Sequence, residues 1–264
     1  PKLQGVTLKH NYYWYFDKIF GMKSLSHVQG FSGVDLMTVT GIKIMDNVLN
    51  AGISSLDVKI EVTGNPNYEG ILEEADKLKK AGFDELYDNL SIEKDQDVFT
   101  LFLSPVSFSK DQISEVKLIL KLIRSVYEDC FIIIKLHPST QKRFTRIFNE
   151  TCKEVLKNFL IIDKITSDTF NMRLVLLSKA IIQKQSTVGF IAMVLGQPII
   201  SYNLIDTGYY DNLYKHLDCS FHAESDKEFI TSLHCLNSVD ELARLRQRQE
   251  KACTNFCLRV NSPN

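Results

Sequence analysis

Residues 184–201 read KQSTVGFIAMVLGQPIIS and indicate an α/β fold. An apolar run at 180–182 precedes this stretch, and the hydroxyls of Ser186 and Thr187 can cap the helix that follows. The helix is expected to end at Gly196, just before a second apolar run. A helix that begins at the carboxyl end of a strand is a common anion-binding place in α/β proteins. An ordinary capped helix without a ligand explains the same residues.

A second strand-to-helix junction lies earlier in the chain. Residues 131–136 are almost all apolar and rich in Ile, as expected for a strand buried on both faces of a parallel sheet. His137 and Pro138 end this strand, and Pro138 biases His137 away from helical geometry. Ser139 or Thr140 can cap the next helix. A lone His is more often structural, but its place at the carboxyl end of a strand favours a ligand-binding role.

Strand-like and helix-like segments alternate through the middle of the chain. Five strands are expected, at 98–103, 131–136, 159–162, 180–182 and 199–201. This alternation predicts a doubly wound, Rossmann-like parallel sheet, in which the loops after the strands meet at one edge. The side chains expected there donate hydrogen bonds and include almost no carboxylate, which suits a phosphate or diphosphate. They are Ser104, Ser107, His137, Ser139, Ser186 and Thr187.

Composition excludes several classes of protein. The 264 residues include 31 basic and 32 acidic side chains, so the net charge of −1 gives no general electrostatic reason to expect a nucleic-acid partner. No apolar run reaches the length needed for a transmembrane segment. The six cysteines form no CxxC pair and no metal-ligand spacing, which indicates free thiols in a reducing compartment.

Residues 84–97 are acidic and lack strong periodicity, so they are expected to form a linker or surface loop. This stretch contains one Asp-x-Asp motif, Asp95-Gln96-Asp97, of the kind that can hold a divalent metal. Because the motif precedes its strand, it is expected at the amino edge of the sheet, away from the phosphate-binding loops. No metal site and no cofactor are therefore expected.

The order and spacing of three motifs resemble the carboxyl-terminal half of the two-domain nucleotide-sugar enzymes with the GT-B fold. That group includes many glycosyltransferases and the UDP-N-acetylglucosamine 2-epimerases. Related His-Pro and Ser-Thr elements occur in bacterial sialyltransferase-like, Kdo-transferase-like and polyol-phosphate-transferase-like proteins that build capsules and surface polysaccharides. The resemblance covers about residues 33–203 and rests on VTGNP at 62–66, His137-Pro138, and STVG at 186–189 with LGQPII at 195–200.

The resemblance implies a set of roles. In those families the His-Pro histidine and the Ser/Thr loop contact the phosphates of the donor, so His137 is expected to be catalytic and, with Pro138, Ser186 and Thr187, to bind the donor. Gly189 would let the helix backbone approach the ligand. The implied reaction is metal-independent transfer of a sugar from a nucleotide-sugar donor to a capsular or lipopolysaccharide-type glycan. The implied location is cytoplasmic, with peripheral association at the inner face of the membrane.

Two departures from the family pattern leave alternatives open. Many relatives carry a Glu for the ribose shortly after the Ser/Thr/Gly loop, where this chain has Phe-Ile-Ala-Met at 190–193. The epimerase version of the loop, Ser-Gly-Gly followed by acidic residues, is also missing, which weighs against an epimerase. A nucleotide-sugar epimerase or hydrolase and a non-catalytic nucleotide-sugar-binding domain remain the alternatives.

The resemblance also implies a domain division. Residues 1–62 are expected to be the remnant of an amino-terminal, acceptor-side domain together with the interdomain connection. Residues 63–264 are expected to form the nucleotide-sugar-binding domain with two closing helices. The start at Pro1, without an initiator Met, suggests a fragment of a larger enzyme. Among the tail residues, His222 is expected to have a surface or capping role.

Overall fold

The computed structural model divides the chain into two compact units, residues 1–66 with 253–264 and residues 67–252. The sequence pattern assigns the last residues to the larger domain, and that division stays a prediction. An acceptor-side role for the smaller unit stays a prediction. The structure describes residues 35–50, 59–64, 66–103, 110–138, 140, 142–164, 166–184, 186–205 and 213–256.

The smaller unit contains a strand, a helix and a second strand. These are β1 (Leu36–Val39), α2 (Ile42–Asn50) and β2 (Lys59–Val62). The two strands pair in parallel, with Val39 opposite Val62. The sequence pattern predicts a strand at 34–39, a helix at 42–49 and a strand at 58–62, and each observed element lies within two residues of its predicted range.

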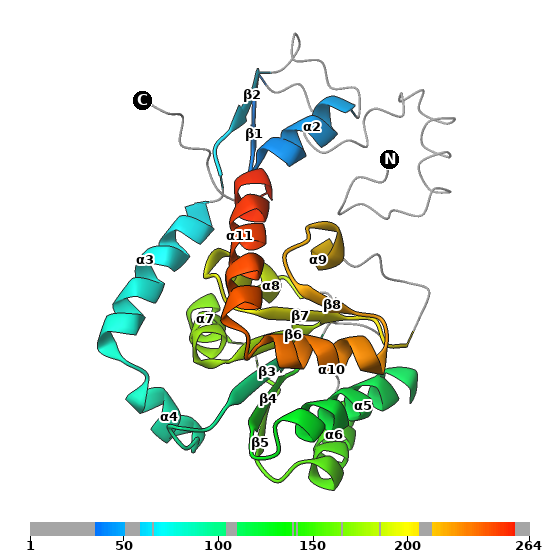
Figure 1. The fold of residues 1–264 in the computed structure, drawn as a ribbon. Helices are drawn as coiled ribbons and strands as arrows, with labels where there is room; N and C mark the ends of the chain where they lie inside the picture. The colour runs from blue at the N-terminus through cyan, green and yellow to red at the C-terminus, as the bar shows by residue number, and fades with distance from the viewer. Residues whose placement is uncertain are drawn as a thin grey trace. The chain divides into compact units, whose positions relative to one another are not determined.

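The larger unit is built on a six-stranded parallel sheet with the order β5-β4-β3-β6-β7-β8 (Figure 1). The predicted doubly wound parallel sheet is therefore confirmed. A sixth strand, which the sequence pattern does not reveal, adds to the five expected ones. It has only three residues and a His at its centre, too short a run for periodicity to be seen. The strands are β3 (Val98–Phe102), β4 (Phe131–Lys135), β5 (Phe159–Ile162), β6 (Ala180–Gln183), β7 (Ile199–Tyr202) and β8 (Phe221–Ala223).

Helices cover both faces of this sheet (Figure 1). On one face α5 (Lys110–Val126) packs against both α6 (Lys142–Val155) and α10 (Asp226–Cys235). On the other face α7 (Asp168–Leu177) packs against α8 (Val188–Val194). The central strands are consequently buried on both sides, which explains the run of Ile in β4.

The remaining helices are α3 (Pro66–Ala81), α4 (Asp84–Leu90), α9 (Leu213–His216) and α11 (Val239–Phe256). In the described part of the chain, no helix combines the length and the apolar character needed to cross a bilayer.

The prediction of an irregular stretch at 84–97 is wrong for its first half, which forms α4. Asp84 and Glu85 occupy the first turn of α4, where acidic side chains favour the positive end of the helix dipole. Leu86 alone is buried, and Ser91 ends the helix with a left-handed φ of 56°. A seven-residue helix with one buried side chain is too short for hydrophobic periodicity to identify.

Candidate functional site

The candidate site lies at the carboxyl edge of the six-stranded sheet. The chain enters the sheet at β3, adds β4 and β5 on one side, and then crosses to β6 on the other side of β3. Ligands of open α/β sheets bind at such a change of winding direction. His137 follows β4 and the Ser186–Thr187 loop follows β6, so the two predicted elements flank β3. With about 4.8 Å between neighbouring strands, the two loops start roughly 10 Å apart.

The loop after β6 is held by its own hydrogen bonds. The Ser186 amide donates to Gln183 Oε1 at 2.7 Å, and the Val188 amide donates to Ser186 Oγ at 3.3 Å. The Gly189 amide donates to the Ser186 carbonyl at 3.1 Å. The Ser186 hydroxyl thus accepts the first helical amide, whereas Thr187 at the N-cap position makes no side-chain cap bond, and these three amides are used within the loop. The groups left to meet a phosphate are the Ser186 hydroxyl hydrogen and Thr187, whose side chain is exposed.

Gly189 is needed for the packing beneath this loop. A Cβ atom at this position would lie 2.2 Å from Gln183 Nε2 and 2.4 Å from Tyr214 Cζ. The Tyr214 hydroxyl donates to the Ser186 carbonyl at 2.5 Å, and its ring lies 5.6 Å from the ring of Phe190. The structure thus gives Gly189 a packing role in supporting the loop, while its contact with a ligand stays a prediction.

His137 lies directly after β4 and is half-buried. Its carbonyl accepts a hydrogen bond from the Thr140 amide at 2.8 Å, which closes the turn through the exposed Pro138. Burial, together with the positive charge of Lys135, lowers the pKa of the His137 imidazole below its ordinary value. At neutral pH the ring is therefore uncharged and offers one N–H donor and one acceptor nitrogen.

Three predicted phosphate ligands, Ser104, Ser107 and Ser139, lie outside the described residues, so their roles stay predictions. The Asp-x-Asp motif is at the amino edge of the sheet, as its position before β3 predicts. There the Asp97 carboxylate accepts hydrogen bonds from Lys179 Nζ at 3.0 and 3.1 Å. Asp97 therefore forms an ion pair at the amino edge of the sheet, the edge opposite to His137.

The structure contains a buried ion pair at the carboxyl edge of the sheet that the sequence motifs do not predict. Lys184 Nζ lies 3.1 Å from Glu115 Oε2 and 3.2 Å from the Ile205 carbonyl, and Glu115 Oε1 accepts the Ile205 amide at 3.0 Å. Both charged side chains are less than a tenth exposed. The pair ties the loops after β6 and β7 to α5. Its signal in the sequence is a carboxylate on the apolar face of an amphipathic helix.

Lys135 is a second residue that the sequence-based site omits. It ends β4, is only 5% exposed, and its Nζ donates to the carbonyls of Leu136 at 2.9 Å and Lys164 at 3.0 Å. Burial lowers the pKa of Lys135, and the charge of Asp163 opposes this. The available signal is a cation at the end of an Ile-rich strand, two residues before His137.

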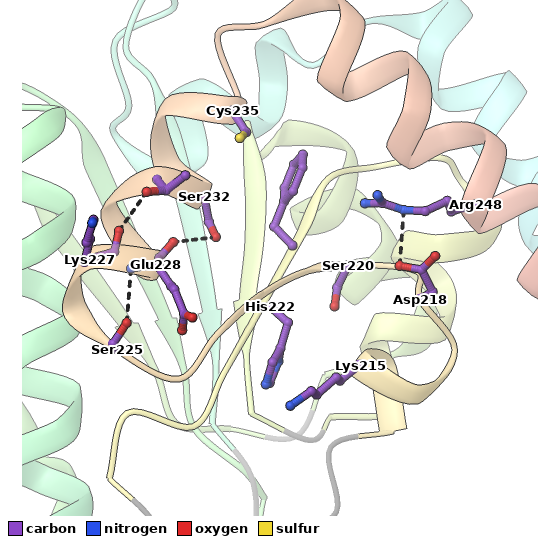
Figure 2. Close-up of a pocket in the computed structure, with 12 residues that line it drawn as sticks. Lys215, Asp218, Ser220, His222, Ser225, Lys227, Glu228, Ser232, Cys235 and Arg248 are labelled. Atoms are coloured by element: carbon purple, nitrogen blue, oxygen red, sulfur yellow. Dashed lines mark hydrogen bonds and ion pairs between the residues drawn. The ribbon is translucent and has the colours of Figure 1, made fainter.

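A separate pocket lies beside β8 and is lined by residues near α9, α10 and α11 (Figure 2). It has a volume of about 570 Å³. Two of its basic side chains have acidic partners: Arg248 Nε lies 3.4 Å from Asp218 Oδ1, and Lys215 Nζ lies 2.5 Å from Glu224 Oε1. This pairing makes the pocket a weaker anion site than the sheet edge.

His222 lies in β8 at this pocket and links two strands, so it is more than a surface or capping residue. Its Nδ1 is 2.8 Å from Ser201 Oγ, which is in turn 2.7 Å from Ser220 Oγ, and its Nε2 is 3.2 Å from Glu224 Oε1. Burial lowers the pKa of His222, although hydrogen bonding to Glu224 opposes the shift. The imidazole is therefore neutral at pH 7 and forms part of a continuous chain of polar groups.

We expect His222→Gln to reduce the dependence of stability on pH. Because the folded pKa lies below the unfolded value, the unfolded protein binds the proton more readily. The contribution of the neutral His222 is thus present above pH 6.5 or so and is lost as the pH falls through the folded pKa. Urea unfolding of wild type and variant at pH 8, 6.5 and 5 measures this contribution to the free energy of unfolding. The stability difference between wild type and variant should shrink toward pH 5, and a constant or growing difference would contradict the assignment.

Similarity to known proteins is found at the level of three-dimensional structure. No protein-family profile and no curated protein sequence matches this chain. The UDP-GlcNAc 2-epimerase of Methanocaldococcus jannaschii, solved with UDP-GlcNAc and UDP, is 19% identical, with a TM-score of 0.57 over 82% of this chain and 59% of the epimerase. The wall teichoic acid polymerase TagF is 14% identical, with a TM-score of 0.54 over 97% of this chain and 59% of TagF.

A glycosyltransferase from Rickettsia africae is 11% identical, with a TM-score of 0.59 over 96% of this chain and 64% of that protein. This chain has the GT-B fold. The resemblance to GT-B nucleotide-sugar enzymes is thereby confirmed in fold. The chain spans less than two thirds of the length of each of these three proteins.

Proposed function

We propose that this chain is the donor-binding part of a glycosyltransferase that moves a sugar from a nucleotide-sugar donor to a surface glycan. The observation that carries the proposal is the placement of His137 and the Ser186–Thr187 loop on the two strands that flank β3, at the change of winding direction. The M. jannaschii epimerase of the same fold was solved with UDP-GlcNAc and UDP, which supports a nucleotide-sugar ligand.

The proposed reaction is substitution at the anomeric carbon of the donor sugar. The bond from this carbon to the phosphate oxygen breaks, a bond to the acceptor oxygen forms, and negative charge develops on the leaving phosphate. His137 donates an N–H to that phosphate, and the hydroxyls of Ser186 and Thr187 donate two further hydrogen bonds. The acceptor hydroxyl loses its proton to a base on the acceptor side. These neutral donors require no metal ion in the proposed step.

The acceptor is proposed to be a capsular or lipopolysaccharide-type glycan that is extended at the inner face of the membrane. TagF, a wall teichoic acid polymerase, has the same fold, which supports an acceptor of the cell-surface class. Incubating the protein with a nucleotide-sugar donor and purified surface glycan, and following incorporation of labelled sugar, tests this acceptor directly. Release of the sugar only to water would contradict it.

His137→Ala is expected to weaken nucleotide binding and to slow turnover. The variant loses a hydrogen bond to a charged phosphate, so the affinity for UDP or CMP should fall about tenfold. Calorimetry with UDP and with CMP, together with a donor-consumption assay, gives both quantities. His234→Ala is the matched control, because His234 is exposed on α10 and should change neither. Unchanged affinity and rate in His137→Ala would refute the assignment.

An epimerase or hydrolase is the second candidate, because solved UDP-GlcNAc 2-epimerases share the fold. Incubation with UDP-GlcNAc and no acceptor separates the two reactions, since an epimerase or hydrolase consumes the donor alone while a transferase needs the acceptor. Nucleotide binding without turnover, under either condition and in the full-length protein, would favour a non-catalytic binding domain.

A further inference from the structure

Lys135 is a buried cation whose two hydrogen-bond partners are backbone carbonyls. Its ammonium donates to the carbonyls of Leu136 and Lys164, which belong to the loops after β4 and β5. Within the described residues no carboxylate lies at ion-pair distance, and Asp163 acts on it only through longer-range charge. An ammonium group has three N–H donors, so these two bonds leave one of its donors over.

Lys184, which follows β6 at the same sheet edge, provides a direct comparison. Its ammonium is also buried, but its charge is balanced by Glu115 at 3.1 Å. A buried charge is costly unless it is paired. Glu115 compensates the charge of Lys184, so the burial of Lys184 needs no bound ligand to explain it. The charge of Lys135 has no equivalent balance within the described residues. A phosphate at the carboxyl edge would supply the missing negative charge.

The position of Lys135 also connects it to His137. Lys135 is the last residue of β4, and His137 follows it after one intervening residue. Leu136 and Lys164 lie on the two loops that border His137 on the β4 and β5 side. A side chain that fastens both loops therefore fixes the backbone from which His137 projects.

We propose that Lys135 is a positioning residue of the donor-phosphate site, which fastens the loops after β4 and β5 and places an unbalanced positive charge behind His137. This inference rests on the proposed nucleotide-sugar function. The charge has two consequences. It attracts the donor phosphates, and it adds to the larger effect of burial in lowering the pKa of the His137 imidazole, so that the neutral ring binds the phosphate as a hydrogen-bond donor.

The test replaces the ammonium by a neutral side chain of similar length. Lys135→Met is compared with wild type and with Lys179→Met, in which the same change is made at the opposite edge of the sheet. Histidine ring signals are followed by NMR from pH 5 to 8, with the His137 signal assigned by its loss in His137→Ala. Calorimetry with UDP is carried out at pH 6 and pH 8, and thermal unfolding shows that each variant is folded.

Lys135→Met is expected to raise the pKa of His137 and to weaken UDP binding on the order of tenfold at pH 8. In this variant UDP should bind more tightly at pH 6 than at pH 8, because a larger fraction of His137 is then protonated at pH 6 than in wild type, although burial still lowers its pKa. Lys179→Met should leave both the His137 titration and the UDP affinity as in wild type. If Lys135 had only a structural role, Lys135→Met would lower the unfolding temperature but would change neither the His137 titration nor the UDP affinity.

Two results would overturn the inference. One is an unchanged His137 titration in folded Lys135→Met, or unchanged UDP affinity where wild type binds UDP. The other is a wild-type His137 that titrates at or above the ordinary value near 6.5, a result that does not depend on Lys135→Met being folded. If wild type binds no nucleotide, the proposed function fails, whereas the coupling of Lys135 to His137 is still decided by the titration.

Discussion

Gly189→Ala is expected to lower the free energy of unfolding by about 3 kcal/mol, because overpacking a well-filled core is costly. The added Cβ would lie 2.4 Å from Cζ of Tyr214, a ring that is 1% exposed and cannot move into solvent. Moving this ring would also break the hydrogen bond from its hydroxyl to the Ser186 carbonyl. Urea unfolding measures the loss, and calorimetry with UDP should show weaker binding because the loop shifts.

Gly70→Ala is the matched control for this substitution. Gly70 lies within α3 and has no other atom within 4 Å of its added Cβ. Alanine there removes only the excess freedom of glycine in the unfolded chain, so stability should rise by about 0.5–1 kcal/mol. Equal effects of the two substitutions would show that Gly189 is not held between Tyr214 and Gln183.

Glu115→Ala is expected to cost about 3–5 kcal/mol, because it leaves the buried ammonium of Lys184 without its carboxylate. The Ile205 amide loses its acceptor in the same variant. Equilibrium unfolding in urea gives the loss. The double variant Glu115→Leu with Lys184→Met should recover much of it, since an apolar pair removes the unpaired charge as well.

Glu154→Ala provides the comparison with an ion pair in solvent. Glu154 binds Lys117 on the exposed sides of α6 and α5, so its removal should change the free energy of unfolding very little, and less still in high salt. A loss for Glu115→Ala no larger than that for Glu154→Ala would contradict the view that burial makes the Glu115–Lys184 pair important.

The fold follows from the sequence wherever a segment is long and regular. β4 is a continuous apolar run buried on both faces, and the segment after β6 lies between a hydroxyl-bearing loop and Gly196, so apolar runs and helix-boundary residues predict both elements closely. Two short elements, α4 and β8, escape prediction because they bury only one or two apolar side chains each. Tertiary contacts stabilise such elements, and a single sequence does not reveal those contacts.

The candidate site is predictable only in part. Loop positions such as His137 and Ser186 follow from topology, because all parallel strands end at one edge. The partners that support them do not. The contact of Gly189 with Tyr214 and the pairing of Lys184 with Glu115 join residues 25 and 69 positions apart. Local sequence patterns carry no information about such distant pairs. A charged residue within an apolar run does indicate that a distant partner exists, but not which residue it is.

The two outermost strands of the six-stranded sheet have a further consequence for the behaviour of the protein in solution. β5 has four residues and β8 has three, so each border offers few unpaired backbone groups. Long, flat borders act as templates on which another chain can add a strand, whereas very short ones do not. The brevity of β5 and β8 therefore protects the protein against edge-to-edge aggregation while its fully buried inner strands remain strongly apolar.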